Sequence, residues 1–338
     1  MGLIRSTTEG TSQVARGFFT ALFALVLVLS GLYLYQNKWE EAAQQLPILY
    51  ELSDAYKVGL RSLGGVSEQA LRRFYELNES PDLFSQEESK APPQVGLRST
   101  WKGKKILAKL EKAGFSGGRM RAARQFVDYI ETHKEAAQRE MYKYKVPASI
   151  KLAQALLESS AGQSKLARLA NNHFGIKARL SSYARQKVKA RQYNELRDED
   201  FLFIKPATGV YNFHDDHSYD RFETYPSVSD SYSRHTQLLT RPCTPGQKGC
   251  YSWIWRTFPV GNDCDITEAA HVFQPASGIA PREFFDGQTT VPYYAACAAG
   301  LKMAGYATSR TYHQKLWYLI DTYELWRLDL ALLKGMEE

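Results

Sequence analysis

The chain has 338 residues, of which 44% are hydrophobic and 23% charged, so it can hold one large folded domain together with appendages. Its net charge of +7 suits an anionic polymer or a membrane surface as a partner. No nucleic-acid-binding motif accompanies this charge, and we therefore exclude nucleic acid as a partner.

The first predicted element is a transmembrane anchor at residues 17–36. The segment GFFTALFALVLVLSGLYLY carries no charge. As a helix rising about 1.5 Å per residue it reaches about 28 Å, close to the hydrocarbon thickness of a bilayer. Arg5 and Arg16 precede it, so the positive-inside rule keeps residues 1–16 in the cytoplasm and exports the remainder. A cleaved signal peptide is the alternative, although no clear small-x-small cleavage site follows Leu32.

Residues 37–100 are interpreted as a juxtamembrane stalk. The stretch ESPDLFSQEESKAPPQVG near its end is polar and contains three prolines, which is typical of a linker. A passive spacer is one interpretation of the stalk, and a docking element for a partner assembly is the other. The apolar residues available for such docking are Leu46, Ile48, Leu49, Leu52, Tyr56 and Leu60.

The folded domain is expected over residues 101–338, and its first part is predicted to be helical. Phe126, Tyr129 and Ile130 recur at helical spacing within residues 106–144. A further helix should begin at Pro147, which suits a first turn because its missing N–H is not needed there. Gly162 follows at a position where this helix can stop.

Glu158 is the candidate catalytic residue of this second helix. Ile150, Ala153 and Leu157 recur at helical spacing, and Glu158 lies at the edge of the apolar stripe that they form. A carboxyl group at such an edge is partly desolvated, which raises its pKa and keeps a proton available near neutral pH. That property is what a general acid for a glycosidic bond needs. Because most charged residues are merely solvated, the surrounding motif must decide whether Glu158 is catalytic.

The residues around Glu158 continue a longer ordered pattern. Its members are Ala153-Gln154, Leu157-Glu158-Ser159, Gly162, Ser164, Leu166-Ala167 and Asn171-Asn172-His173-Phe174-Gly175-Ile176-Lys177. This gapless segment resembles the signature of the family 73 glycoside hydrolases, bacterial N-acetylglucosaminidases that cut peptidoglycan. The resemblance implies that Glu158 is the catalytic acid. It also implies a set of substrate-binding residues: Gln154, Asn172, His173, Phe174 and Tyr312.

A small β-hairpin is predicted after a charged insertion. Residues 178–209 depart from the shorter family pattern and are expected to form a solvated helical excursion. The stretch GVYNFHDDHSYDRFETY then alternates apolar and polar residues around a polar turn, which predicts a hairpin. Ser227 or Asp230 should cap the next helix. The order of helix, glutamate, hairpin and helices is that of a lysozyme-like α+β fold, mainly α with a small β-hairpin lobe and a cleft between the two parts.

The resemblance also implies a second acid on the hairpin, facing the catalytic glutamate. Asp215 and Asp216 are the candidates, and neighbours on a strand point to opposite faces, so only one can face the cleft. Tyr211, Phe213 and Asp215 share one face, and if this aromatic face lines the sugar site, Asp215 is the partner. A bulge would reverse this parity in favour of Asp216. Glu223 on the returning strand is a third choice.

No metal and no cofactor is expected. His214 and His217 flank the two aspartates, but residues three apart on a strand point to opposite faces and do not converge on one ion. The cysteines show no zinc spacing either. Hydrolysis of a glycosidic bond by two carboxyl groups needs no cofactor.

Four cysteines, Cys243, Cys250, Cys264 and Cys297, all follow the predicted anchor. An even count on the exported side argues for two disulfides, of which three pairings are possible. Cys243 and Cys250 bracket the turn-rich loop Thr-Pro-Gly-Gln-Lys-Gly, which can close locally. Pairing them leaves Cys264 with Cys297.

Residues 240–291 form a second departure from the family pattern and are expected to build a cleft wall or lid. Trp253, Trp255 and Phe258 could stack on sugar or could pack the core of this insertion.

The end of the chain carries a closing motif. Gly305-Tyr306-Ala307-Thr308, followed by Tyr312, resembles the last motif of the family, with Ser309-Arg310 in place of its Asp-Pro. The resemblance implies that Tyr306 lines the catalytic cleft. A single final helix is predicted over about residues 312–333. The stripe that should pack into the core comprises Tyr312, Leu316, Leu319, Tyr323, Trp326 and Leu330.

Together these features predict a membrane-anchored glycoside hydrolase, recognisable over about residues 124–330, that cleaves peptidoglycan glycan strands after N-acetylglucosamine. We expect a single-pass protein of the bacterial inner membrane with its enzyme in the periplasm. The hairpin acid would activate water or stabilise the oxocarbenium-like transition state, or the substrate's own acetamido group would be the nucleophile. The alternatives are a muramidase or lytic transglycosylase, and a non-catalytic peptidoglycan-binding scaffold of an envelope secretion or conjugation machine.

Overall fold

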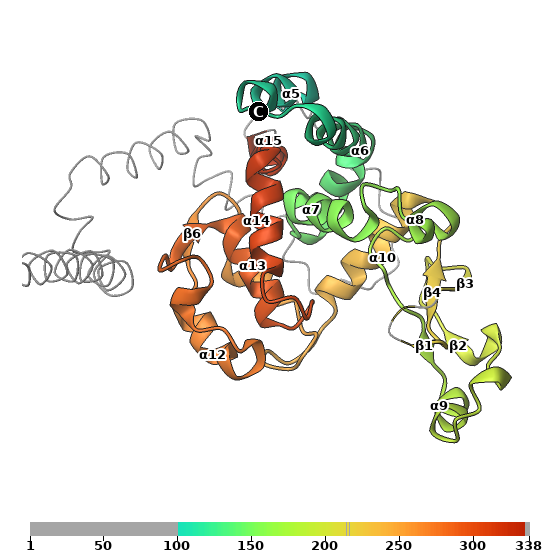
Figure 1. The fold of residues 1–338 in the computed structure, drawn as a ribbon. Coiled ribbons are helices and arrows are strands. Elements are labelled where there is room, and N and C mark those ends of the chain that lie inside the picture. The colour runs from blue at the N-terminus through green and yellow to red at the C-terminus, as the bar shows by residue number, and fades with distance from the viewer. Residues whose placement is uncertain (1–100, 214, 216, 335–338) are drawn as a thin grey trace, which may run out of the picture. The chain divides into compact units, whose positions relative to one another are not determined.

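The computed structural model describes residues 101–334, apart from 214 and 216 (Figure 1). The predicted anchor at 17–36 and the stalk at 37–100 lie outside the described residues. Within the described residues, no helix combines the length and apolar character needed to cross a membrane.

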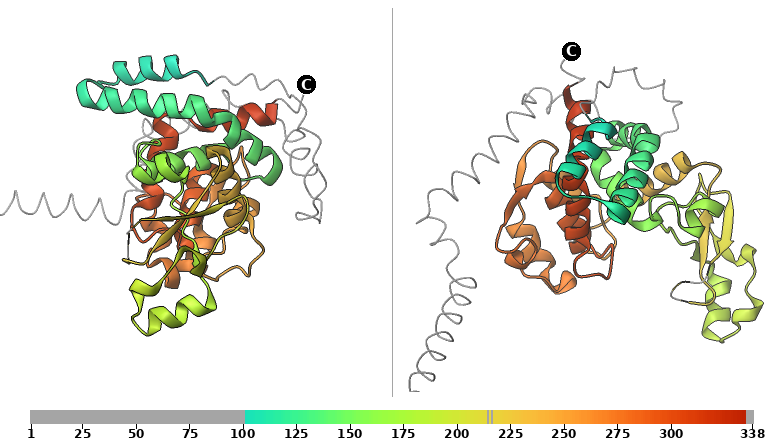
Figure 2. Two further views of the ribbon diagram at one scale, coloured as in Figure 1. Left: turned by 90° about the vertical axis from the view of Figure 1, so that its right-hand side faces the viewer. Right: turned by 45° about the horizontal axis from the view of Figure 1, so that its top comes forward.

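Helices dominate the described part of the chain (Figures 1 and 2). Before the hairpin they are α5 (Gly103–Lys112), α6 (Gly117–Tyr144), α7 (Ala148–Ser159), α8 (Lys165–Ala170), α9 (Ser182–Lys189), and the 3-10 turns η1 (Tyr193–Glu195) and η2 (Asp198–Asp200). After it come α10 (Val228–Thr240), α11 (Ile254–Thr257), α12 (Thr267–Ser277), η3 (Pro281–Glu283), α13 (Tyr293–Met303), α14 (Tyr312–Thr322) and α15 (Trp326–Lys334).

The described strands form antiparallel pairs. These are β1 (Arg179–Leu180) with β2 (Phe201–Leu202), β3 (Gly209–Asn212) with β4 (Arg221–Thr224), and β5 (Asp263–Asp265) with β6 (Thr290–Pro292). The mainly helical fold with a small β-hairpin agrees with the predicted class.

Helix α7 lies at the centre of the helical part, packed against α6, α13, α14 and α15. The predicted helix is confirmed, but it is not the amphipathic element that its apolar stripe suggested. Every side chain from Ala148 to Leu156 is buried, including Lys151 and Gln154. A helix buried on all sides must find partners for its polar residues inside the protein. Only its last turn, with Glu158, reaches the surface.

Both ends of α7 are fixed by polar contacts. At its start, the backbone N–H and hydroxyl of Ser149 donate to the Asp329 carboxylate from α15, at 2.9 and 2.5 Å. A carboxylate at this position also complements the positive end of the helix dipole. At its end, three consecutive residues adopt positive φ, and the Gly162 N–H donates to the Ser159 hydroxyl at 2.7 Å. A Cβ on Gly162 would lie 3.2 Å from the Tyr129 ring. Glycine suits this position because the backbone is left-handed and the Tyr129 ring approaches closely.

The hairpin forms where the alternating pattern predicted it. Tyr211 pairs with Phe222, and Asn212 with Arg221. Tyr211 and Phe213 pack beside Phe222 against α8 residues Leu166 and Ala170. This contact joins the hairpin to the segment that follows α7.

The insertion at residues 178–209 is more structured than the solvated helical excursion that we expected. It contains α9, but also the strands β1 and β2 and a small core of its own formed by Ala184, Leu196 and Phe201. Val210 of β3 packs on this core. Figure 1 shows the insertion beside the β3–β4 hairpin. Because the two share apolar contacts, the insertion extends the hairpin lobe.

The prediction of one final helix over residues 312–333 is wrong. Helix α14 ends at Thr322 and α15 begins at Trp326. Glu324 has a φ of 50°, its N–H donates to Asp321 O at 3.2 Å, and the Leu325 N–H donates to Ile320 O at 2.9 Å. These two bonds form a Schellman motif, which ends α14 although a glutamate holds the left-handed position that glycine usually takes.

One of the two predicted disulfides is present in the structure, and the other is not. Cys243 and Cys250 are disulfide-bonded as predicted, with their Cα atoms 5.6 Å apart. The predicted Cys264–Cys297 disulfide is wrong, because both thiols are free and buried. The Cys264 thiol donates to Asn262 O and the Cys297 thiol to Phe258 O, each at 3.6 Å. Each thiol is thus directed at a backbone carbonyl of another residue.

Two aromatic residues of the second insertion belong to its core. Trp255 and Phe258 are 4% and 1% exposed, so their rings pack inside the protein. Trp253 is partly exposed and stacks on Phe273, with ring centroids 4.6 Å apart. Trp255 and Phe258 therefore pack in the core of the insertion and are not placed to stack on a sugar.

Candidate active site

Glu158 is the exposed residue in the last turn of the buried helix α7 and lies beside Tyr306 and Tyr312; we call this setting the recess. Its carboxylate retains contact with solvent, yet surrounding protein desolvates it and raises its pKa above the usual range of a glutamate. The Tyr312 hydroxyl, which donates to Glu158 Oε1 at 3.1 Å, and the positive charge of Lys315 partly offset that rise. Such an environment favours a carboxyl group that can hold a proton and release it.

A short hydrogen-bonded chain positions Tyr312 against Glu158. Gln154 lies one turn before Glu158 on the same face of α7, and its amide donates to the Tyr312 hydroxyl oxygen at 3.1 Å. The oxygen of Tyr312 accepts this bond, so its proton is directed to Glu158. Burial, together with the neighbouring charges of Tyr306 and Glu158, raises the pKa of Tyr312 well above the usual value. Tyr312 therefore stays protonated and remains a hydrogen-bond donor near neutral pH.

Tyr306 forms the second tyrosine wall of the recess. Its ring stacks on that of Tyr312, with centroids 5.6 Å apart and planes 23° apart. Burial raises its pKa well above the usual value, and the negative charge of Glu158 raises it further. The Tyr306 hydroxyl lies 3.0 Å from His235 Nε2 on α10. The structure thus brings together Glu158, Gln154, Tyr306 and Tyr312, which belong to two segments about 150 residues apart in the sequence.

The hairpin acids have different surroundings. Asp215 is half exposed and forms an ion pair with Lys177, whose Nζ lies 2.9 Å from Asp215 Oδ2 and 2.9 Å from Asp220 Oδ2. Asp216 and His214 lie outside the described residues. The face carrying Tyr211 and Phe213 packs in part on α8 rather than standing open to a sugar.

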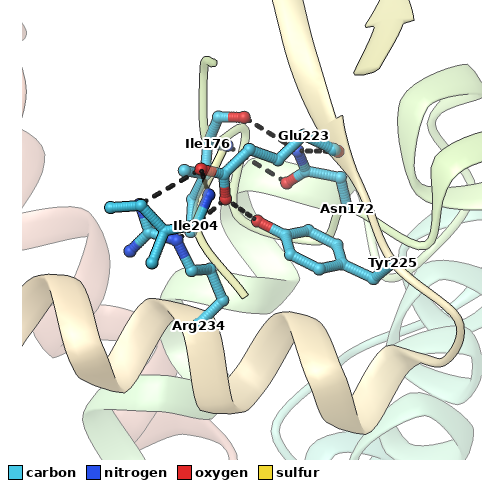
Figure 3. Close-up of polar contacts among 6 residues, drawn as sticks. All are labelled: Asn172, Ile176, Ile204, Glu223, Tyr225 and Arg234. Carbon is cyan, nitrogen blue, oxygen red and sulfur yellow. Dashed lines mark hydrogen bonds and ion pairs between the residues drawn. The ribbon is translucent and has the colours of Figure 1, made fainter. Parts of the chain in front are cut away.

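Glu223, the third choice for the second acid, is a buried structural residue (Figure 3). Its Oε1 accepts from Arg234 Nη2 at 3.1 Å and from the Ile204 N–H at 3.4 Å. Its Oε2 accepts from the Tyr225 hydroxyl at 2.6 Å and lies 2.9 Å from Arg234 Nε. With 1% of its surface exposed and both oxygens bonded, Glu223 cannot approach a substrate.

Asn172 ties the same region together through backbone groups (Figure 3). Its amide donates to Glu223 O at 2.8 Å and to Ile176 O at 3.0 Å, while its carbonyl accepts from the Ile176 N–H at 3.1 Å. An asparagine that uses both ends of its amide in this way fixes strand β4 against the loop after α8.

Three predicted substrate-binding residues are buried inside the protein. Asn172, His173 and Phe174 are each 5% exposed or less. The Tyr129 hydroxyl lies 2.6 Å from His173 Nδ1, and Phe174 stacks on His235 with ring centroids 3.9 Å apart. Phe174 thus packs on the histidine that contacts Tyr306, and all three side chains offer little surface to a sugar.

The sequence reasoning missed Lys151 and His235, both without solvent exposure. Lys151 Nζ donates to Tyr232 O at 2.9 Å and to Thr236 Oγ1 at 2.5 Å, and lies 3.5 Å from His235 Nδ1. A lysine inside the run Ile150 to Leu156 is a signal in itself, because lysine is almost never fully buried without partners.

A groove of about 1010 Å³ runs along α7 beside this recess. Its lining includes Leu157, which precedes Glu158 in the chain, and Lys315, whose positive charge acts on the Glu158 carboxyl group. The residues that line it are Gln125, Phe126, Leu156, Leu157, Ser160, Gln163, Thr311, Gln314, Lys315, Tyr318 and Leu319. Within the described residues, no group of three or more histidine, cysteine, aspartate or glutamate side chains could hold a metal ion.

Comparison with known proteins gives one family match. The family model described as mannosyl-glycoprotein endo-beta-N-acetylglucosaminidase matches residues 134–325, more than half of the chain. A comparison with curated protein sequences finds no match.

Several solved structures share weak similarity with the chain. An N-acetylmuramoyl-L-alanine amidase from Staphylococcus aureus is 19% identical with a TM-score of 0.35, over 61% of this chain and 43% of that one. The catalytic domain of the autolysin Auto from Listeria monocytogenes is 20% identical with a TM-score of 0.34, over 66% and 95%. A truncated glycoside hydrolase domain of FlgJ from Salmonella typhimurium is 20% identical with a TM-score of 0.31, over 58% and 96%. The chain thus spans less than half the length of the amidase.

Proposed function

The chain belongs to the mannosyl-glycoprotein endo-β-N-acetylglucosaminidase family of glycoside hydrolases, and from this premise we propose that it cleaves peptidoglycan after N-acetylglucosamine with Glu158 as general acid. In this proposal the Glu158 carboxyl group protonates the leaving glycosidic oxygen as the bond breaks.

The observation that carries the proposal is the environment of Glu158. Its pKa is raised because protein surrounds it, while its contact with solvent leaves an oxygen accessible to a substrate. The Tyr312 hydroxyl donates to Oε1 at 3.1 Å and so restrains the position of that oxygen. A positioned acid with a raised pKa is what proton donation to a leaving group requires.

The second half of the reaction is assigned to the hairpin or to the substrate. Asp215 is our preferred second acid, because its half-exposed carboxylate stands near the tip of the hairpin, and Asp216 is the alternative. Either would activate water or stabilise the positive charge that develops on the sugar. The substrate's acetamido group is the other candidate nucleophile.

We further propose that the enzyme is anchored in the bacterial inner membrane and acts in the periplasm. The uncharged segment at residues 17–36 supports the anchor. The Cys243–Cys250 disulfide supports an oxidising compartment. In this arrangement residues 37–100 carry the enzyme away from the membrane or dock it on an envelope machine.

Product analysis tests the proposed reaction. Purified protein is incubated with intact sacculi, and the new chain ends are identified by mass spectrometry after borohydride reduction. We expect reducing-end N-acetylglucosamine. Anhydro-muramic ends would instead identify a lytic transglycosylase, and reducing muramic ends a muramidase. Binding to sacculi without any new ends would identify a scaffold.

A further inference from the structure

Helix α7 carries a buried lysine, Lys151, in its middle, and the hydrogen bonds of its ammonium go to neutral groups. Lys151 is fully buried, and its hydrogen-bond partners Tyr232 O and Thr236 Oγ1 are neutral groups of α10. Its ammonium also lies 5.5 Å above the centre of the Phe174 ring. Removing such a charge from water is costly, so its position calls for a role beyond packing.

Lys151 fixes the hydrogen bonding of His235. A protonated lysine has donors and no acceptor, so His235 Nδ1, 3.5 Å from Nζ, must accept. Burial and the nearby charges of Lys151 and Arg234 lower the pKa of His235 well below its usual value, so the imidazole is neutral and carries one proton. With Nδ1 as the acceptor, that proton belongs to Nε2.

The Nε2–H of His235 then determines which way the hydroxyl proton of Tyr306 points. It lies 3.0 Å from the Tyr306 hydroxyl and donates to that oxygen. The Tyr306 proton consequently turns away from His235, toward the recess that holds Glu158. In the opposite tautomer Nε2 would accept, and the Tyr306 proton would turn inward.

We propose that Lys151 is a positioning residue that acts through His235 to present the Tyr306 hydroxyl as a hydrogen-bond donor to the Glu158 recess. The relay runs from α7 through α10 to the loop before α14, across residues far apart in the chain. Its contribution to hydrolysis rests on the proposed function, whereas the hydrogen-bonded relay itself does not.

The groups that face Lys151 set the conditions of a test. Burial lowers its pKa to about 7, and the carboxylate of Glu140 on α6 opposes that change. His235 and Arg234 face the relay from α10. At about pH 6, roughly one unit below the Lys151 pKa, the ammonium form prevails, and the hydrogen bonds from Lys151 through His235 to Tyr306 should be formed.

The first experiment determines the His235 tautomer directly. In full-length protein labelled with ¹⁵N-histidine, long-range proton–nitrogen spectra at about pH 6 distinguish a protonated ring nitrogen from an unprotonated one. We expect His235 to carry its proton on Nε2, and Lys151→Met to shift it toward Nδ1. A proton on Nδ1 in the unaltered protein would overturn the proposal. So would a tautomer that Lys151→Met leaves unchanged.

The second experiment is a double-mutant cycle on turnover of sacculi. Lys151→Met should lower kcat about 10-fold, the lower end of the effect of orienting partners at metal sites. In a Tyr306→Phe background the same change should cost less than about 2-fold, because the hydroxyl through which it acts is gone. Equal losses in both backgrounds would show that Lys151 acts only on general structure and would overturn the proposal.

Matched controls separate the relay from folding and from the proposed function. Lys165→Met removes an exposed lysine on α8 and should leave both kcat and the His235 spectrum unchanged. Thermal unfolding reports whether Lys151→Met folds, and if it does not, the tautomer of the unaltered protein still decides the proposal. A protein with the expected tautomer but no hydrolysis would refute the proposed function and leave the relay standing.

Discussion

Glu158 and Glu223 are the same residue type in opposite surroundings. Glu158 ends a buried helix, touches solvent and accepts one hydrogen bond from Tyr312. Glu223 lies in a strand, is 1% exposed, and is bonded through both oxygens to Arg234 and its neighbours. The first carboxyl group is desolvated but sparsely bonded, and the second is desolvated and fully bonded.

The difference shows how the protein separates chemistry from structure. A buried carboxylate whose oxygens are all occupied is fixed in charge and position, and it serves to join elements. A carboxyl group that loses water without gaining such partners has a raised pKa and an accessible oxygen. Burial alone therefore does not identify the acid, and the number of its partners does.

The largest expected effect comes from removing the Glu158 proton. Glu158→Gln keeps the shape and the bond from Tyr312 but cannot donate, so hydrolysis of sacculi should fall about 10²–10⁴-fold. The unfolding free energy should change little. Glu111→Gln on α5, an exposed glutamate, is the matched control. Near-normal turnover in Glu158→Gln would end its assignment as the acid.

The converse experiment breaks the Glu223 network. Glu223→Gln leaves Arg234 buried without a countercharge, which should cost about 3–5 kcal/mol of unfolding free energy, measured by urea denaturation. The molecules that remain folded should keep their kcat, measured below the unfolding transition. Unchanged stability with lost turnover would instead place Glu223 in the chemistry and erase the contrast with Glu158.

Local sequence patterns anticipated the parts of this contrast that depend on neighbours in the chain. The helix that carries Glu158, the hairpin at residues 209–225 and the Cys243–Cys250 loop all follow from spacing, alternation or turn composition over short stretches. Ser227 also caps α10 as predicted, accepting from the Asp230 N–H at 3.2 Å.

The features that sequence reasoning missed depend on contacts between distant segments. The partners of Lys151 on α10 lie more than 80 residues away, and no local pattern reveals them. The break at Glu324 places a residue other than glycine at positive φ, so the usual helix-stop signal is absent. Cys264 and Cys297 form no disulfide despite an even cysteine count, which carries no information about where each thiol points.

Asp215 resembles Glu223 in having a cationic partner and Glu158 in being exposed to solvent. It has one cationic partner, Lys177, and its side chain is 49% exposed. As the preferred second acid, Asp215→Asn should lower turnover about 10²-fold. Because exposed ion pairs contribute about 0–1 kcal/mol, stability should hardly change. Asp216→Asn is the paired variant. Because β3 ends at Asn212, strand alternation does not choose between the two aspartates, and loss of turnover in Asp216→Asn alone would make Asp216 the second acid. If neither variant abolishes turnover, the hairpin carries no essential acid.

The smallest expected effect comes from removing the hydroxyl group that donates to Glu158. Tyr312 donates to Glu158 Oε1 and so lowers a pKa that burial raises. Tyr312→Phe keeps the ring stacked on Tyr306 but removes that donor, so the pKa of Glu158 should rise further. A general acid acts in its protonated form, and activity is lost as pH rises through its pKa. The alkaline limb of the pH profile of kcat/KM should therefore move to higher pH in Tyr312→Phe, even where the maximal rate falls. A limb that stays in place, or moves to lower pH, would mean that another group titrates there.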